Sequence, residues 1–445
     1  MRDIFFLLIF PLILYAVFKR PFIGAAMWLW VAMFFPNGWV YGFAGSFRYN
    51  LIIVVCAVIS YLCWKDKEKN EHDPLTFLIL FFLLWTLLTS IFTLSIPEIV
   101  WAEWIEFFKI TLLFVFTITV VRTQLHLNVL IWALALSIGF YGCLEGLKYI
   151  ASGGGHRIAG LHGHILGDRN ELALAFNMLL PLLAYLLHIS KMKIVKFGLF
   201  CAVVLTVVAI IGTYSRGGTV ALIIVGGYFW LQSKHKLLYT VMLVISLSIA
   251  SNFIPSSWSN RMDTLETAQL DSSFLGRVLA WKQAVLMAND NPFTGGGFKA
   301  GQTSYLWWSY NGAGSFNDIV DTSQMHEVTF KAAHSIYFQV LGDHGYIGLF
   351  VFLAIIFTAY FKMGKNIKLA KKYDKDESLI LLCKYLKVSL IAYCAGGAGV
   401  SLAYFDMFYA ILAMTVVIEH KIILSGGNHV NSNSMHKYRR AGINV

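Results

Sequence analysis

Charged residues are scarce in this sequence. Asp, Glu, Lys and Arg make up 13% of the 445 residues, whereas hydrophobic residues make up 58%. A soluble globular domain carries roughly 25% charged residues. Apolar runs long enough to cross a hydrocarbon core recur from one end of the chain to the other. The composition therefore excludes an ordinary soluble domain and indicates a polytopic integral membrane protein.

The sequence also lacks a disulfide or zinc framework. No Cys/His spacing suggests zinc, and no cysteine lies in an extramembrane loop. All six cysteines fall inside apolar runs, where we expect them to be packing residues: Cys56, Cys63, Cys143, Cys201, Cys383 and Cys394. No small-residue cleavage site follows the first apolar run, 4–18, so we expect this run to be retained rather than removed as a signal peptide.

No repeat of 20–50 residues is visible, which weighs against a duplicated transporter core. We predict an all-α membrane protein, a polytopic helical bundle of 13 spans, or 12 if the first two runs form one re-entrant element. The candidate spans are 4–18, 22–38, 50–64, 75–94, 105–121, 127–150, 171–189, 194–213, 218–232, 236–254, 335–361, 379–400 and 403–420.

The formal net charge of +11 comes largely from lysines in short loops, which we interpret as topology rather than as a nucleic-acid footprint. Alternate connections hold Lys19, Arg20, Lys65, Lys67, Lys69, Arg122, Lys191, Lys193, Lys196, Lys234, Lys236, Lys362, Lys365, Lys368, Lys371, Lys372 and Lys375. By the positive-inside rule these connections are cytoplasmic. The outer face then comprises 39–49, 95–104, 151–170, 214–217 and 255–334.

The long outer loop, 255–334, has the composition of a folded segment rather than of a linker. Apolar residues recur at helical spacing between Phe274 and Ala288, and Asn291-Pro292 ends that pattern. We expect a cap over the membrane part. The predicted organisation is 1–125, an N-terminal transmembrane region; 126–254, a transmembrane core; 255–334, a periplasmic loop domain; 335–422, C-terminal transmembrane helices; and 423–445, a cytoplasmic tail.

Three residues on the outer face carry the candidate chemistry. Arg216 stands at a break between two apolar runs, Arg277 lies on the predicted cap helix, and His334 stands where the cap re-enters the membrane. Taken singly, they are ordinary: a snorkelling arginine, a solvated charge and an interfacial histidine. Together, two guanidiniums can neutralise a diphosphate and a neutral imidazole can accept a proton from a hydroxyl.

This combination suits displacement of a lipid diphosphate by an acceptor hydroxyl. The outer loops lack an Asp-x-Asp motif, which would hold a divalent cation for a nucleotide-sugar donor. We therefore expect no metal and no cofactor.

At these positions the sequence resembles the O-antigen ligase superfamily, which includes O-antigen polymerases and bacterial protein O-oligosaccharyltransferases. The resemblance covers roughly residues 150–420. It is carried by Ser215-Arg216-Gly217, Gly276-Arg277 with Trp281, Asn291-Pro292 with Gly295 and Gly297, and His334 followed by Gly342, Gly345 and Gly348. The N-terminal third, with Gly167-Asp168-Arg169-Asn170-Glu171, is similar to putative O-glycosylation ligases associated with exosortase systems.

The resemblance implies a GT-C-like fold in the bacterial inner membrane, with an active site facing the periplasm. It implies metal-independent transfer of glycan from an undecaprenyl-linked donor to a hydroxyl. Arg216 and Arg277 match the arginines that bind the donor diphosphate, and His334 matches the essential histidine. Ser335 stands where many members have asparagine, which puts the usual acceptor in question.

Several further residues are candidates for supporting roles, each with a structural alternative. Asp168 and Asn170 could bind sugar hydroxyls or cap a helix. Trp307 and Trp308 could stack on a sugar or anchor the cap at the interface. Asp343 could orient His334 or pair inside the bundle.

Three hypotheses for the function remain open. The first is transfer of glycan to a protein serine or threonine, such as in a pilin. The second is the same chemistry on lipid A-core or on a growing glycan, and the third is a transporter or flippase, suggested only by the number of spans.

Overall fold

The structure is a computed structural model of the whole chain, and it describes residues 2–234, 236–237, 240, 272–311 and 330–424. The regular elements in these residues are all helical. The N-terminal part comprises α1 (Arg2–Lys19), α2 (Pro21–Phe34), η1 (Pro36–Gly38), α3 (Gly42–Gly45), α4 (Tyr49–Cys63), α5 (Pro74–Ile91) and α6 (Pro97–Val120).

The chain continues through the middle and C-terminal parts in the same way. The middle part comprises α7 (Gln124–Leu134), the π-helix η2 (Ala135–Gly139), α8 (Phe140–Ala151), α9 (Arg169–Ile189), α10 (Lys193–Gly212) and α11 (Arg216–Gln232). Then follow α14 (Ser272–Asp290), η4 (Ala300–Gln302), α15 (Ser304–Asn311), α16 (Ile336–Lys372), α17 (Glu377–Gly397), α18 (Asp406–Val417) and the π-helix η5 (Ile418–Leu424). Each predicted span coincides with one or more of these helices, except 236–254, most of which lies outside the described residues.

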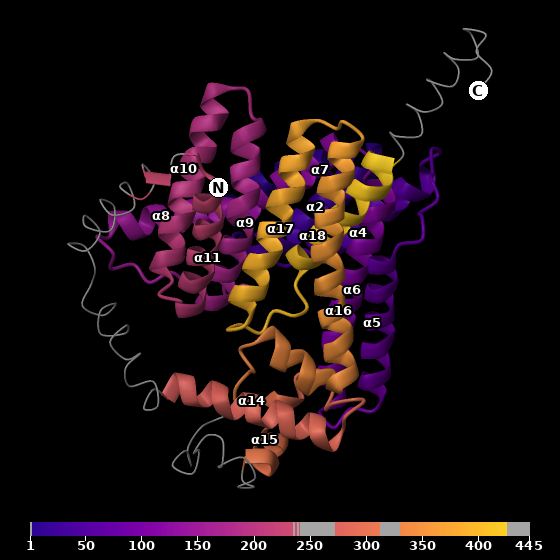
Figure 1. Cartoon of the computed structure of the whole chain (residues 1–445), viewed down its shortest axis with the longest axis vertical. Coiled ribbons are helices and arrows are strands. Elements are labelled where there is room, and N and C mark those ends of the chain that lie inside the picture. The colour runs from indigo at the N-terminus through magenta and orange to yellow at the C-terminus, as the bar shows by residue number, and fades with distance from the viewer. Residues whose placement is uncertain (1, 235, 238–239, 241–271, 312–329, 425–445) are drawn as a thin grey trace.

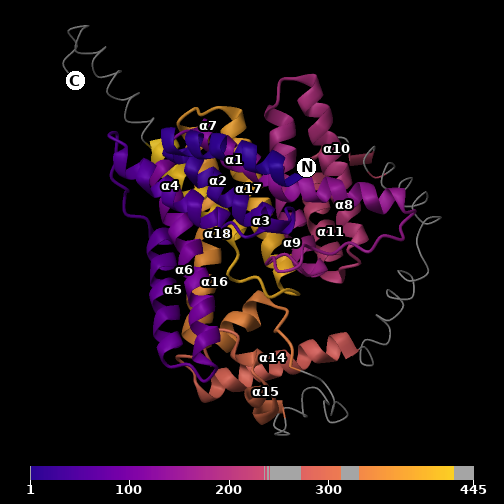
Figure 2. The ribbon, with the colours of Figure 1, turned by 180° about the vertical axis from the view of Figure 1, so that it is seen from behind.

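Helix α17 is central to the bundle, packed against α9, α11 and α16. Its inward side chains, including Leu386 and Tyr393, are completely buried. Helix α16 packs on α5, and α18 packs on α6. Figure 2 shows the N-terminal helices α1, α2 and α4 on the other side of the bundle, where α2 contacts both α4 and α7.

The two ends of the bundle differ in charge. The lysine-bearing connections from α9 to α10 and from α16 to α17 lie at the same end, which we call the basic end. Helices α14 and α15 lie across the opposite end, which we call the cap end (Figure 1). This arrangement agrees with the predicted alternation of basic and non-basic connections.

Six described helical segments are long and apolar enough to cross a membrane: 74–91, 124–151, 169–189, 193–212, 336–372 and 377–397. The number is smaller than the predicted 12 or 13. Helices α2, α4 and α11 have 14, 15 and 17 residues, fewer than the roughly 20 that a crossing needs. Helix α6 is longer but carries Glu103, Glu106 and Lys109.

The described cap residues form no separate domain, contrary to the predicted folded loop domain. Their own buried clusters are small: Leu279, Ala280 and Trp307 in one, and Met287, Ala300 and Leu306 in the other. Instead, α14 packs along α16. Too little apolar surface is available for an independent core, so the cap depends on the bundle for its position.

Glycines dock the cap onto a break in α16. The backbone at Gly345 has φ of 68°, which interrupts the helix. The amide of Gly296 donates to the Gly342 carbonyl at 2.8 Å, and the amide of Gly297 donates to the Asp343 carbonyl at 2.9 Å. A Cβ on Gly295 would lie 2.6 Å from the Gly345 nitrogen. Gly345 thus permits a close backbone contact with the cap, and Gly342 permits close packing of α16 on Ala284 of α14.

Candidate active site

Arg216 is the first residue of α11, and the chain turns sharply before it. Tyr214 has a left-handed backbone with φ of 52°. Ser215 is the N-cap, and its hydroxyl accepts a hydrogen bond from the Gly218 amide at 3.2 Å. The same hydroxyl donates to Asn170 Oδ1 at 2.7 Å. This bond ties the start of α11 to the start of α9, and the half-buried Arg216 follows directly.

Asp168 and Asn170 build the start of α9. Asp168 is the N-cap in a capping box with Glu171, and it accepts from the Asn170 amide at 2.8 Å. The capping alternative is therefore confirmed for Asp168. Asn170 bridges Asp168 and Ser215, so both residues hold the α9–α11 corner; a role in binding sugar remains a prediction.

His334 stands directly before α16, and its backbone is left-handed with φ of 45°. Strain of this kind in a non-glycine residue persists only where the surroundings enforce it, and it is common at functional sites. Here the Trp281 indole of α14 donates to the neighbouring Ala333 carbonyl at 2.7 Å. The Trp281 ring also stacks on Phe338 at 5.0 Å. Helix α14 is thereby held against the His334 segment.

Ser335, the residue that departs from the family pattern, is the N-cap of α16 and is almost completely buried. Serine and asparagine both rank among the best N-cap residues. The substitution therefore preserves the start of the helix, although the Ser335 hydroxyl makes no capping bond.

Arg277 lies one turn before Trp281 on α14 and reaches the loop that follows α17. Its Nη1 is 3.9 Å from the position that a Cβ on Gly399 would occupy. The corresponding position on Gly217 lies 3.8 Å from the Gly396 carbonyl oxygen. Gly217, which follows Arg216, therefore lies near the segment 396–399. The guanidinium of Arg277 lies near the same segment.

Charged groups from several elements act on His334. Burial lowers the pKa of His334, and the positive charges of Arg277 and Lys331 lower it further, whereas Asp168 opposes them. Arg277 belongs to α14, Lys331 to the segment before α16, and Asp168 to the start of α9. His334 is therefore neutral at physiological pH, and no side chain in the described part of the chain hydrogen-bonds to its ring.

Three helix N-termini lie next to residues of this group in the chain, and each carries a partial positive charge. They belong to α9, α11 and α16, which begin after the N-caps Asp168, Ser215 and Ser335. Unsatisfied amides at such ends favour anions. With two guanidiniums beside them, the arrangement can hold a multiply charged anion such as a diphosphate next to a neutral imidazole.

The remaining predicted residues are Trp307, Trp308 and Asp343. Trp307 is 1% exposed and packs against Leu279 and Ala280, so its ring supports the cap rather than presenting a face to a sugar. Trp308 is 50% exposed. Asp343 accepts hydrogen bonds from the Lys299 amide at 3.1 Å and from the Tyr404 hydroxyl at 3.2 Å, which indicates pairing inside the fold rather than orientation of His334.

A polar cavity next to this group was not predicted from the sequence. It lies between α14 and α16, with Gln283, Lys331, Ala333 and Gln339 in its lining. Ala333 immediately precedes His334. A glutamine on an amphipathic helix and a lysine in a loop carry no motif, so no sequence signal could have found them.

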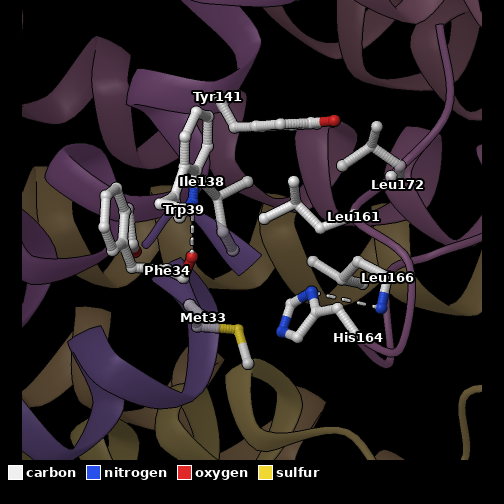
Figure 3. Close-up of a pocket in the computed structure, with 11 residues that line it drawn as sticks. Met33, Phe34, Trp39, Ile138, Tyr141, Leu161, His164, Leu166 and Leu172 are labelled. Carbon is white, nitrogen blue, oxygen red and sulfur yellow. Dashed lines mark hydrogen bonds between the residues drawn. The ribbon is translucent and has the colours of Figure 1, made fainter. Parts of the chain in front are cut away.

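A second cavity, of about 310 Å³, is mainly apolar (Figure 3). Met33, Phe34, Leu161 and Leu166 contribute to its lining. Its histidine, His164, is bonded through both ring nitrogens, to the Leu166 amide at 3.4 Å and to the Ala32 carbonyl at 2.8 Å. We therefore assign His164 to local structure rather than to catalysis.

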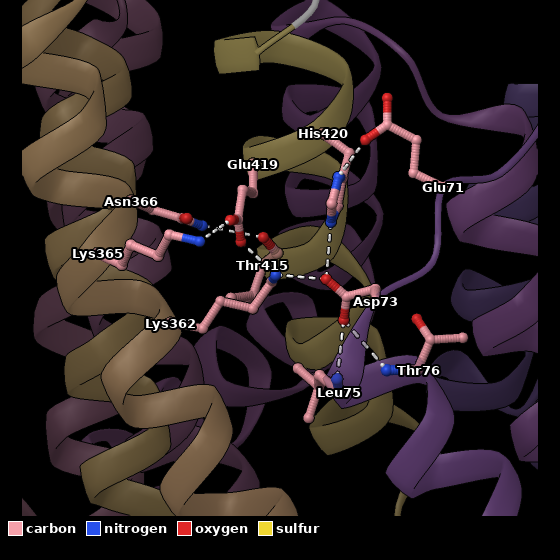
Figure 4. A network of polar contacts seen from close by, with 10 residues as sticks. All are labelled: Glu71, Asp73, Leu75, Thr76, Lys362, Lys365, Asn366, Thr415, Glu419 and His420. Atoms are coloured by element: carbon pink, nitrogen blue, oxygen red, sulfur yellow. Dashed lines mark hydrogen bonds and ion pairs between the residues drawn. The ribbon is translucent and has the colours of Figure 1, made fainter.

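Among the described residues, Asp73, Glu419 and His420 place possible metal-ligand atoms within 4.8 Å of one another. Lys362 forms ion pairs with both carboxylates, and His420 Nε2 lies 2.8 Å from Asp73 Oδ2 (Figure 4). The ammonium groups of Lys362 and Lys365 thus already balance the charge of the two carboxylates. Burial raises the pKa of Asp73, but hydrogen bonds from His420 and Lys362 outweigh it and hold the pKa below its ordinary value. This cluster joins the start of α5 to α16 and η5.

Two parts of the chain match different protein families. Residues 201–353 match the family described as O-Antigen ligase, and all of Arg216, Arg277 and His334 fall within this range. Residues 1–191 match a family of unknown function, DUF5935. A search of curated proteins finds no significant match. The chain thus carries an O-antigen ligase domain, a domain of glycan-transferring enzymes, next to an N-terminal region of the DUF5935 family.

Proposed function

We propose that this chain transfers a glycan from an undecaprenyl-diphosphate donor to a serine or threonine hydroxyl of a protein, such as a type IV pilin. The reaction takes place on the periplasmic face of a bacterial inner membrane, without a metal ion. The observation that carries the proposal is that Arg277 and Asp168 both act on the charge of His334. The hydrogen bond from Ser215 to Asn170 also joins the helix that begins at Arg216 to the corner that holds Asp168.

Each residue has one role in the proposed reaction. Arg216 and Arg277 bind the donor diphosphate with their planar, permanently charged guanidiniums. His334, kept neutral by its surroundings, accepts the proton of the acceptor hydroxyl as the oxygen attacks the anomeric carbon. The new glycosidic bond forms as the bond to the diphosphate breaks, and the diphosphate leaves with that electron pair. Attack opposite the leaving group inverts the anomeric configuration.

The second candidate keeps this chemistry and changes the acceptor to lipid A-core or to a growing glycan. The match of residues 201–353 to the O-antigen ligase family favours this acceptor. The protein acceptor is favoured instead by the resemblance of the N-terminal region to exosortase-associated ligases and by Ser335 in place of asparagine. A transporter or flippase has no support beyond the number of apolar helices.

Comparison of a deletion strain with its parent separates the two acceptors. We expect the mass of the pilin-like acceptor to fall by the mass of one glycan in the deletion strain, while lipopolysaccharide is unchanged. Truncated lipopolysaccharide with unchanged protein masses would assign the chain to the second candidate.

A further inference from the structure

The cavity between α14 and α16 contains a buried side chain with unmet hydrogen-bonding capacity. Gln283 is only 1% exposed, and neither its amide oxygen nor its amide nitrogen has a partner within the described residues. Buried amide groups are almost always hydrogen-bonded, because leaving them unpaired costs stability. An unpaired glutamine that lines a cavity therefore points to a ligand that completes its bonds.

Other polar groups surround the same space. The Gln339 oxygen accepts from the Ala403 amide at 3.1 Å, which leaves its amide nitrogen as a donor. The hydroxyl of Ser401 is buried and has no partner within the described residues. The lining thus contains amides, a hydroxyl, the side chains of Lys299 and Lys331 and the carboxyl group of Asp343, and Met287 and Phe338 add apolar surface. Amide, hydroxyl and carboxyl groups of this kind can hydrogen-bond to the hydroxyls of sugars.

One wall of the cavity lies close in sequence to the segment that Arg277 approaches. On α14, Arg277 and Ala284 are seven residues apart and lie on one face, and Ala284 lines the cavity. Gln283 is about 9 Å along the helix axis from Arg277, at about 1.5 Å per residue. Ser401 follows two residues after Gly399, which the Arg277 guanidinium approaches. A group joined directly to a diphosphate held by Arg277 would enter this cavity.

We propose that the cavity binds the sugar that is attached to the donor diphosphate, with Gln283 as a positioning residue that hydrogen-bonds to its hydroxyls. This inference rests on the proposed function, because it takes Arg277 to hold the diphosphate. The cavity would then help to determine which lipid-linked sugar the protein accepts.

The test compares two probe lipids with the full chain in lipid nanodiscs. One probe is undecaprenyl diphosphate, and the other is undecaprenyl diphosphate that carries a single N-acetylhexosamine. We expect Gln283→Met to weaken binding of the sugar-bearing lipid about tenfold, as the loss of one or two hydrogen bonds predicts. Binding of the bare lipid should change less than about twofold. Leu286→Met, a volume-conserving change in the same helix outside the cavity lining, is the control and should affect neither lipid.

Thermal unfolding shows whether the variant is intact. Gln283→Met removes an unpaired amide, so its midpoint should be no lower than that of the unmodified protein. If Gln283→Met does not fold, Ser401→Ala repeats the test from the opposite wall and should show the same selectivity to a smaller degree.

Equal weakening of both lipids by Gln283→Met, or no effect on either, overturns the sugar cavity. An unchanged donor affinity with a raised KM for the acceptor also overturns it. Arg277→Ala tests the proposed function separately and should weaken both lipids; if it weakens neither, the diphosphate site fails, whatever Gln283 does.

Discussion

At the residue scale, the guanidinium of Arg216 is expected to matter for its shape as well as for its charge. Lysine keeps the charge but cannot form two parallel hydrogen bonds to a phosphate. We predict that Arg216→Lys lowers kcat/KM by about tenfold to a hundredfold, the equivalent of losing one charge-assisted hydrogen bond. Arg157→Lys, at an exposed position in the 151–168 loop, is the matched control. Near-normal turnover by Arg216→Lys would count against diphosphate recognition by this residue.

The protonation of His334 predicts the pH profile of the reaction. A general base works in its neutral form, so activity is lost as the pH falls through the pKa of His334. Burial and the charges of Arg277 and Lys331 lower that pKa below its ordinary value of 6.5. We therefore expect the acidic limb of kcat/KM to have its midpoint below pH 6.5.

Arg277→Ala checks the cause of this shift. Removal of the positive charge should move the midpoint upward toward 6.5, independently of how far the maximum rate falls. A midpoint that does not move, or one that lies above 6.5 in the unmodified protein, would contradict His334 as a base beside Arg277.

Residues with a recognisable motif could be predicted from the sequence, but their neighbours could not. Arg216 and His334 stand at breaks in apolar runs, where the cost of membrane burial makes a charged or polar residue conspicuous. Gln283 and Lys331 have ordinary surroundings in the sequence. They become notable only because the fold buries Gln283 and places Lys331 beside Gly276. Trp307 was expected at a surface but is buried, since aromatic composition cannot distinguish a core side chain from an exposed one.

At the element scale, the contact of the cap with α16 depends on glycine. Gly295 has φ of 62°, and a Cβ there would lie 2.6 Å from the Gly345 nitrogen. We predict that Gly295→Ala destabilises the protein by about 1–3 kcal/mol, from backbone strain and steric overlap, and lowers activity by displacing Trp281 from the His334 segment. The midpoint of thermal unfolding and the transfer rate measure these effects.

Gly198→Ala is the control, because no atom lies within 4 Å of the added Cβ in α10. It should be neutral or slightly stabilising. If Gly295→Ala behaves in the same way, the close backbone contact does not hold the cap.

The ion cluster at the basic end predicts a second effect on stability. Lys362→Met would remove the buried ammonium that pairs with both Asp73 and Glu419, which are 0% and 3% exposed, and leave only His420 beside Asp73 and the exposed Lys365 beside Glu419. Loss of one partner of a buried pair costs about 3–5 kcal/mol. Lys365→Met removes a lysine that is 62% exposed and should cost less than about 1 kcal/mol. Similar unfolding midpoints for the two variants would contradict this role of Lys362.

Helical segments were predicted well because a long apolar run has few alternatives in a membrane. The break of α16 at Gly345 was not predicted, since a glycine inside an apolar run is also compatible with close helix packing. The short helices α2 and α4 show the same limit: an apolar run predicts a helix, whereas its length decides whether it can cross.

At the scale of the whole molecule, the separation of the basic end from the cap end was predictable, because the lysines alternate between connections. The dependence of the cap on the bundle was not, since it arises from contacts between segments far apart in the chain. Thr93, in the connection from α5 to α6, donates to the Gly296 carbonyl at 2.9 Å, and Ser95 bonds to Thr303 at 2.6 Å.

Metal independence is a prediction for the complete enzyme. The proposed site neutralises the diphosphate with guanidiniums and helix N-termini, so we expect full activity in the presence of excess EDTA. Loss of activity that one divalent ion restores would contradict this assignment of the charge-neutralising role.

The most direct test of the central claim is intact-mass measurement of a pilin-like acceptor after incubation with the purified chain and a defined undecaprenyl-linked glycan. The unmodified chain should add the mass of one glycan unit to the acceptor. His334→Ala, shown to be folded and inserted, should reduce the rate by about a hundredfold or more, as expected for loss of a general base. Transfer by His334→Ala at the rate of the unmodified chain would contradict the account.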